Sequence, residues 1–124
     1  MSQSVILIAD RSISFDEIQS KFAPDFQTGF ASPERFVVES EDDYLAFDAD
    51  DSIVNDYEAA ELEGIPISNP TFYSLKFTDF VFLKKLLPFF ADDPRIWVDD
   101  DHGHILPGPE FVKRMRQALH GNGK

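Results

Sequence analysis

The sequence predicts a single α+β domain over residues 1–124, built as a mostly antiparallel sheet with helices packed on it. The chain has 124 residues, the size of one ordinary domain, and 43% of them are hydrophobic. Strand-like segments alternate with segments of helical period in the order β-α-β-β-α-β-α-β-β-α. Several of these strands follow one another closely enough to form hairpins, and hairpins favour antiparallel pairing.

The N-terminal part carries one strand and one helix. Residues 5–9 form an apolar, β-branched run that predicts a buried strand. Ser14 and Glu17 stand at the N-cap and the third helical position of a capping box. Apolar residues follow at helical spacing, so a short helix is expected after Ser14.

The middle of the chain predicts a hairpin followed by a helix. Residues 35–40 and 44–48 have strand-like composition, and the acidic stretch 41–43 between them is typical of a tight turn. Residues 51–63 show a loose helical period, and Gly64 would end such a helix. We therefore expect one surface helix over 51–63.

The last part predicts a strand at 72–77, strands at 95–99 and 104–106, and a helix that starts at 107–109. Between the first two strands, Thr78 and Asp79 can cap a helix that runs to about residue 90. This helix is apolar almost all round, which predicts that it is central and buried. Its phenylalanines, and the tryptophan at position 97, are expected to pack in the core. These residues are Phe80, Phe82, Phe89, Phe90 and Trp97.

The negative charge of the chain is concentrated in one segment. The net charge is −12, and residues 36–75 hold eleven acids and no Lys or Arg. By contrast, residues 76–124 hold seven acids and eight bases. Phosphate binding needs basic side chains, so this segment disfavours nucleic acid and anionic membranes as partners. It favours a basic protein partner, whose approach it would accelerate.

Signatures of catalysis are missing from the sequence. The chain has no Cys, which excludes a disulfide scaffold, a thiolate zinc site and a Cys nucleophile. It also lacks a G-x-S-x-G elbow, a Gly-rich phosphate loop and an H-E-x-x-H motif. We expect a non-enzymatic protein without catalytic residues, metal or cofactor. No apolar stretch approaches the roughly 20 residues needed to span a bilayer, so a cytoplasmic location is expected.

One short segment offers an alternative chemistry. Asp99, Asp101, His102 and His104 could supply oxygen and nitrogen ligands to a divalent metal, as in a metal-dependent enzyme. The calcium-loop frame that starts at Asp99 fails, because His104 occupies the position that requires Gly. Asp and Gly are common turn formers, so we interpret the segment as a turn between two strands.

The acidic segment is the strongest candidate for a binding site. A charge run can simply keep a protein in solution, but here aromatic residues are interleaved with the acids, and aromatic residues are enriched at the centres of interfaces. The predicted partner-binding residues are Glu41, Asp42, Asp43, Tyr44, Asp48, Asp50, Asp51, Asp56, Tyr57, Glu58 and Glu61.

The second half of the chain resembles a known class of proteins. The stretch 72–79, the Leu/Phe-rich helix after it, and the stretches 97–103 and 106–111 form a pattern of strand, helix, strand, acidic turn and helix. This pattern is similar to that of small bacterial immunity proteins, which are encoded beside secreted polymorphic toxins. The resemblance implies a non-enzymatic inhibitor that occupies the active site of a toxin or a nearby surface. The alternative is an intracellular adaptor that binds a host-cell protein.

Overall fold

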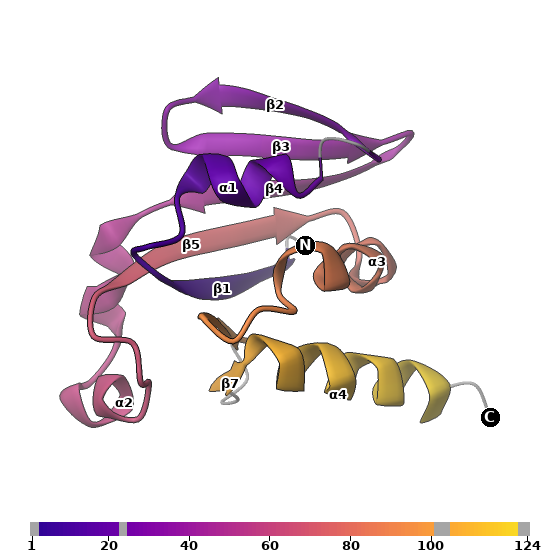
Figure 1. The fold of residues 1–124 in the computed structure, drawn as a ribbon. Helices are drawn as coiled ribbons and strands as arrows, with labels where there is room; N and C mark the ends of the chain where they lie inside the picture. Colours follow the sequence, from indigo (N-terminus) through magenta and orange to yellow (C-terminus); the bar gives the residue numbers. More distant parts are fainter. Residues whose placement is uncertain (1–2, 23–24, 101–104, 122–124) are drawn as a thin grey trace.

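The chain folds around one seven-stranded antiparallel sheet, as the sequence predicted (Figure 1). The computed structural model describes residues 3–22, 25–100 and 105–121. The strand order is β2-β3-β4-β5-β1-β6-β7, and every neighbouring pair is antiparallel. In chain order the elements are β1 (Gln3–Asp10), α1 (Phe15–Ser20), β2 (Gln27–Ser32), β3 (Arg35–Ser40), β4 (Asp43–Ala49), the 3₁₀ helix η1 (Asp51–Asp56), α2 (Ala59–Glu63), β5 (Pro70–Phe77), α3 (Phe80–Phe90), β6 (Ile96–Asp99), β7 (Ile105–Pro107) and α4 (Gly108–Gly121).

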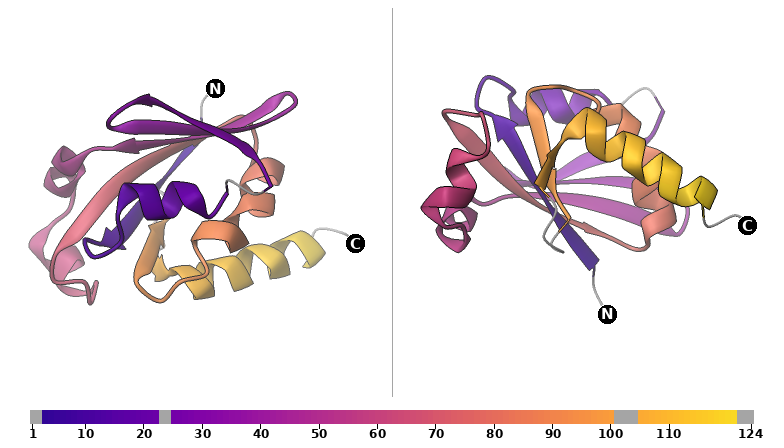
Figure 2. Two further views of the ribbon diagram at one scale, coloured as in Figure 1. Left: turned by 45° about the horizontal axis from the view of Figure 1, so that its top comes forward. Right: turned by 90° about the horizontal axis from the view of Figure 1, so that it is seen from below.

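One face of the sheet, which we call the helical face, is covered by α1, α3 and α4 (Figure 2). Alternate residues of each strand point to this face, so Val5 and Leu7 of β1 join its core. Aromatic rings fill the centre: Phe36 and Phe47 stack with ring centroids 4.5 Å apart, and Phe90 meets Phe47 edge-on at 5.1 Å. The main hydrophobic core therefore lies between the sheet and these three helices.

The opposite face, which we call the lobe face, is covered at one end by η1, α2 and the residues that follow α2. The other set of alternate residues forms a smaller cluster there, with Ile8 and Phe72 from the sheet and Ile53 and Ile65 from the covering segment. Trp97 is partly buried and packs against this cluster. Strand β1 is thus buried on both sides, which explains its continuous apolar run.

Two of the predicted helix starts are confirmed by their side-chain caps. Ser14 Oγ accepts a hydrogen bond from the backbone N–H of Glu17 at 3.0 Å. Asp79 Oδ1 accepts from the backbone N–H of Phe82 at 3.0 Å, so α3 begins directly after Asp79. Both caps satisfy backbone donors that would otherwise lack a partner in the first helical turn.

The single helix predicted over residues 51–63 is wrong. The segment forms η1 and a five-residue α2, separated by Tyr57 and Glu58, and the backbone of Tyr57 is extended at φ −107° and ψ 144°. The Tyr57 ring packs against Phe72, with centroids 5.7 Å apart, and its hydroxyl donates to Asp99 Oδ2 at 2.6 Å. These tertiary contacts fix Tyr57 in a position that interrupts the helix.

Two other predictions need correction. Strand β2 was not predicted, because five of its six residues are exposed and its only strand neighbour is β3. Helix α3 is not central: it lies on the helical face, where Val81 is 72% and Phe80 is 36% exposed. Phe82 and Phe90 are buried, as predicted, and Phe89 is partly buried.

Helix α4 begins where the chain passes close to the end of α3. A Cβ atom on Gly108 would lie 1.9 Å from the carbonyl oxygen of Ala91 and 3.0 Å from that of Ile96. Only glycine allows this approach of backbone to backbone. The last helix is thereby held against the sheet edge, with Phe111 and Val112 buried beneath it.

Candidate functional site

The structure divides the eleven acids of the acidic segment into three groups. Six lie on residues 50–63, which we call the acidic lobe. Three lie on residues 41–43 at the β3–β4 hairpin, which we call the acidic turn. The remaining two, Glu39 and Asp48, lie on β3 and β4.

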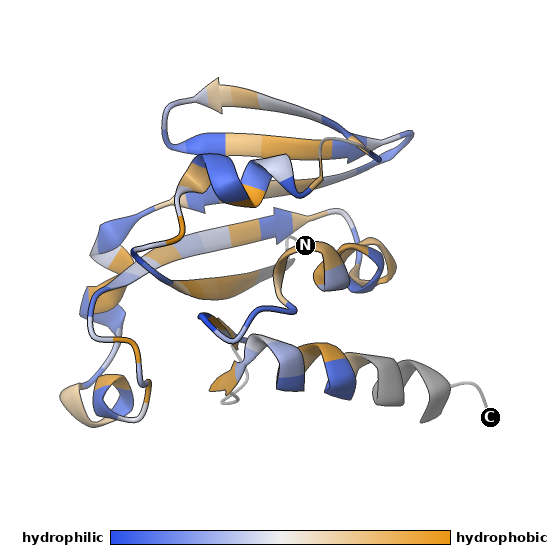
Figure 3. Cartoon of the chain, in the orientation of Figure 1, coloured by the Kyte–Doolittle hydropathy of each residue, from blue (hydrophilic) through white to orange (hydrophobic). Residues whose placement is uncertain are grey.

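The acidic lobe and the acidic turn lie at opposite ends of the sheet (Figures 1 and 3). Strand β4 runs from one to the other, and its seven residues span about 20 Å. This separation exceeds the Debye length of about 8 Å at physiological ionic strength. The predicted partner-binding acids on residues 41–43 and 50–63 therefore form two separate acidic sites, and the predicted residue Asp48 lies on β4 between them.

The space between the two acidic sites is partly neutralised. Arg35 of β3 lies opposite Asp48 of β4, and its Nη1 atom is 3.1 Å from each of the two carboxylate oxygens. Lys76 of β5, which is exposed, lies opposite Ala46 of β4. In the sequence, these two bases lie just before and just after the acidic segment. In the sheet they lie on either side of β4, between the two acidic sites, because β4 pairs with β3 and with β5.

The acidic turn is a two-residue connection with an unusual backbone. Ser40 pairs with Asp43, and Glu41 between them has φ 52°, in the left-handed region that favours glycine. Asp43 Oδ1 accepts a hydrogen bond from the Thr78 hydroxyl at 2.8 Å. A shallow hollow beside the turn is also lined by Asp79 and Lys85 of the α3 region. The acidic turn therefore has a base close to it.

The acidic lobe is held in shape by its own side chains. Asp50 Oδ1 accepts from the backbone N–H of Ser52 at 3.0 Å and from its hydroxyl at 2.6 Å, which caps η1. Glu61 Oε1 accepts from the backbone N–H of Glu58 at 2.9 Å, which caps α2. Asp51, Asp56 and Glu63 take no part in these caps, and their side chains are exposed to a partner.

Arg11, directly after β1, binds the start of β5 and lies close to one acid of the lobe. Its Nε atom donates to Asn69 Oδ1 at 3.3 Å, and its Nη2 atom donates to the carbonyl oxygen of Pro70 at 3.1 Å. The same Nη2 atom lies 4.0 Å from Asp51 Oδ1, a pair in which both side chains are largely exposed. Such a pair is worth at most about 1 kcal/mol, so most of the negative charge of the lobe is left for a partner.

A cavity of about 310 Å³ lies between the acidic lobe and the sheet. Its walls are mainly apolar, and Glu63 and Ser68 stand among the residues that line it. The apolar part of the lining consists of Ile8, Val54, Leu62, Ile65, Ile67, Pro70 and Phe72. The pattern of residues 51–63 predicted a helix with an apolar side, but it gave no sign that this side leaves a hollow.

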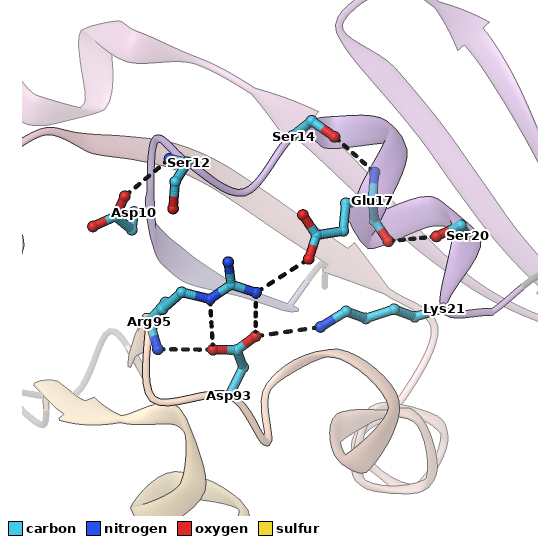
Figure 4. A network of polar contacts seen from close by, with 8 residues as sticks. All are labelled: Asp10, Ser12, Ser14, Glu17, Ser20, Lys21, Asp93 and Arg95. Atoms are coloured by element: carbon cyan, nitrogen blue, oxygen red, sulfur yellow. Dashed lines mark hydrogen bonds and ion pairs between the residues drawn. The ribbon is translucent and has the colours of Figure 1, made fainter.

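A carboxyl outside the acidic segment, that of Asp93, has a strongly lowered pKa and lies in a network of polar contacts (Figure 4). Hydrogen bonds from the Arg95 guanidinium lower the pKa of Asp93 to about 2. Arg95 Nη2 lies 2.9 Å from Asp93 Oδ2 and 3.1 Å from Glu17 Oε2, and Lys21 Nζ lies 3.5 Å from Asp93 Oδ2. We call these four residues the Arg95 cluster. It joins α1 to the connection between α3 and β6 and thus has a structural role.

The predicted alternative of a metal site falls mostly outside the described residues. Asp101, His102 and His104 are not among them, while Asp99 accepts the hydrogen bond from Tyr57. Within residues 3–22, 25–100 and 105–121, no group of three or more His, Asp or Glu side chains is placed to hold a metal ion.

Within the described residues, no helix has both the length and the apolar character needed to cross a bilayer.

Comparisons with protein-family models, with curated proteins and with solved structures find no match for the chain.

Proposed function

We propose that the chain is an immunity-type inhibitor, a non-enzymatic protein that binds a basic surface of a toxin through the acidic lobe. One observation carries this proposal: residues 50–63 hold six carboxylates and no base, on a short segment that is capped by its own side chains and packed on the sheet through Ile53. A fixed group of like charges costs stability through self-repulsion. The positive charges of a basic partner would offset that repulsion, so the binding free energy would be more favourable.

The lobe suits this role better than the acidic turn does. Lys85 stands beside the turn, and Asp43 already accepts a hydrogen bond from Thr78. Arg35 engages Asp48 between the two sites. Among the residues that the structure describes, the ion pair formed by a lobe carboxylate is the long, exposed contact of Arg11 with Asp51. Against a toxin that cleaves nucleic acid, carboxylates on the lobe would occupy the positions where the substrate's phosphates bind.

Matched charge reversals test the proposal. The lobe variant changes Asp51, Asp56 and Glu63 to Lys, which spares the capping residues Asp50 and Glu61. The turn variant changes Glu39, Glu41 and Asp42 to Lys, so that both variants have the same net charge. The partner is captured from the source cells with the wild-type chain and identified by mass spectrometry. Association rates are then measured at low and high salt.

We expect the lobe variant to associate at least tenfold more slowly at low salt, with a smaller difference at high salt, because steering by surface charge is screened. The turn variant should associate nearly as fast as the wild-type chain. Equal rates for the lobe variant and the wild-type chain at low salt would overturn the electrostatic mechanism.

Co-expression separates the immunity role from the adaptor role. The captured partner should stop the growth of host cells when it is expressed alone, and co-expression of this chain should restore growth. The lobe variant should fail to restore growth, while the turn variant should succeed. A partner that is harmless when expressed alone would contradict the immunity role and favour an adaptor.

A further inference from the structure

Charge attraction explains how the acidic lobe would bind a basic partner, but it does not explain the apolar cavity under the lobe. We propose that it receives one apolar side chain of the partner, and that Lys or Arg residues flank this side chain and contact the lobe carboxylates. The inference rests on the proposed function, because it names the kind of segment that the lobe would bind. The arguments for it are the size, lining and charge of the cavity.

The size and lining of the cavity favour a side chain over a cofactor. Its volume of about 310 Å³ lies at the lower limit of small-molecule sites, which range from about 300 to 1,000 Å³. Such sites also present several converging polar groups to orient a ligand. Here the lining offers the Glu63 carboxylate and the Ser68 hydroxyl against seven apolar residues. An aliphatic or aromatic side chain from another protein matches this lining.

The acids near the cavity favour basic residues on both sides of the partner's apolar side chain. Glu63 is both a lining residue and an exposed acid of the lobe. Asp56, Glu58 and Glu61 lie on the same segment, within seven residues of it, and all are exposed. Protein interfaces commonly place an apolar anchor at the centre and charged residues at the rim. An apolar hollow with one carboxylate in its lining, on a segment that carries further exposed acids, therefore fits an apolar residue set between basic ones.

Three short peptides serve as probes. The first has the sequence Lys-Arg-Leu-Arg-Lys, the second replaces its Leu by Ser, and the third, Glu-Glu-Leu-Glu-Glu, keeps the Leu but reverses the charges. Each is capped at both ends and titrated into the full chain while backbone amide and methyl NMR spectra are recorded. The wild-type chain is also diluted without peptide to detect self-association.

We expect the first peptide to shift the methyl resonances of Leu62, Ile65 and Ile67. The second should bind on the order of tenfold more weakly, because the transfer of one leucine side chain out of water is lost. The third should not bind measurably. A Leu62→Ser variant should bind the first peptide about as weakly as the second, whereas Val81→Ser, an exposed apolar site on α3, should leave binding unchanged.

Three other results of the titrations would each contradict a different part of the proposal. If both basic peptides bind equally well, the cavity takes no side chain, and the acidic-lobe proposal stands provided that the lobe variant weakens both. If the acidic peptide binds as well as the basic one, the cavity is used but the proposed partner charge is wrong. Concentration-dependent shifts of the cavity methyls without peptide would make a second copy of the chain the occupant.

Absence of binding of any peptide at millimolar concentration would overturn the inference. An unfolded Leu62→Ser variant, detected by its amide spectrum, is replaced by Ile67→Ser, which removes apolar lining outside α2.

Discussion

The two faces of the sheet differ in how much they bury and in what they expose. Among the residues whose burial the structure describes, the helical face carries a core of 23, rich in phenylalanine, under three helices. The lobe face carries a cluster of four buried residues under η1 and α2, next to a cavity and a group of carboxylates. Since buried apolar area supplies most of the folding free energy, the helical face dominates stability. The lobe face can therefore keep features that favour binding over stability.

The strongest test of this difference compares two phenylalanines of the sheet. Phe47 is fully buried in the helical face and Phe72 is 2% exposed in the lobe face. Phe47→Ala should cost about 3–5 kcal/mol of unfolding free energy, as large core truncations do. Phe72→Ala should cost less, because the lobe beside the cavity can settle into the space. Urea unfolding of both variants measures the difference, and equal losses would refute it.

A second test concerns the contact that holds α4 on the helical face. Gly108→Ala should cost about 1–3 kcal/mol, since its Cβ would overlap the Ala91 carbonyl oxygen and force the backbone apart. Gly29→Ala is the matched control, because a Cβ atom on Gly29 meets nothing within 4 Å. Thermal unfolding should show a large loss for the first variant alone. A Gly108→Ala protein of wild-type stability would contradict the close approach.

A third test uses pH to probe the Arg95 cluster, which borders the helical face. The folded-state pKa of Asp93 is lowered to about 2 from 3.8, so its contribution to stability is present above pH 3.8 and is lost as the pH falls through about 2. Asp93→Asn should therefore destabilise the protein at pH 7 and make little difference near pH 2. Asp92→Asn, at the exposed neighbouring residue, is the control. A pH-independent effect of Asp93→Asn would exclude the ion-pair explanation.

The smallest expected effect is at the acidic turn. Glu41 has a positive φ, which costs an L-residue roughly 1–2 kcal/mol and glycine almost nothing. Glu41→Gly should therefore raise the unfolding free energy by up to about 1 kcal/mol, and Asp42→Gly should not. Denaturant unfolding checks this gain. A loss of stability in Glu41→Gly would mean that the Glu41 side chain contributes more than the strained backbone costs.

Local patterns predicted much of the fold, because most of its elements are set by short-range rules. Ser14 and Asp79 start helices through their own side chains, and β1 contains the β-branched run at residues 5–9. The helix expected over 51–63 failed because Tyr57 is fixed by Phe72 and Asp99, which are distant in sequence. Strand β2 was missed because an exposed edge strand carries little hydrophobic pattern.

The candidate site was predicted in composition but not in arrangement. The acidic segment was visible in the sequence, whereas its division by Arg35 and Lys76 depends on strand pairing. The position of Arg35 could have been predicted, because a two-residue turn after Ser40 places Arg35 opposite Asp48. The position of Lys76 and the cavity under the lobe could not be foreseen, because both depend on β5 joining the sheet beside β4.

The connection between β4 and β5, which contains the lobe, leaves and rejoins the sheet at neighbouring points. Ala49 of β4 pairs with Tyr73 of β5, and the backbone N–H of Asp50 donates to the carbonyl oxygen of Phe72 at 3.0 Å. Residues 51–69 are thus an insertion within a hairpin, and the cost of closing such a loop grows only slowly with its length. Related chains could exchange this insertion for one of another length or charge and keep the scaffold, provided that Ile8 and Phe72 stay covered. Partner choice would then diverge faster than the fold.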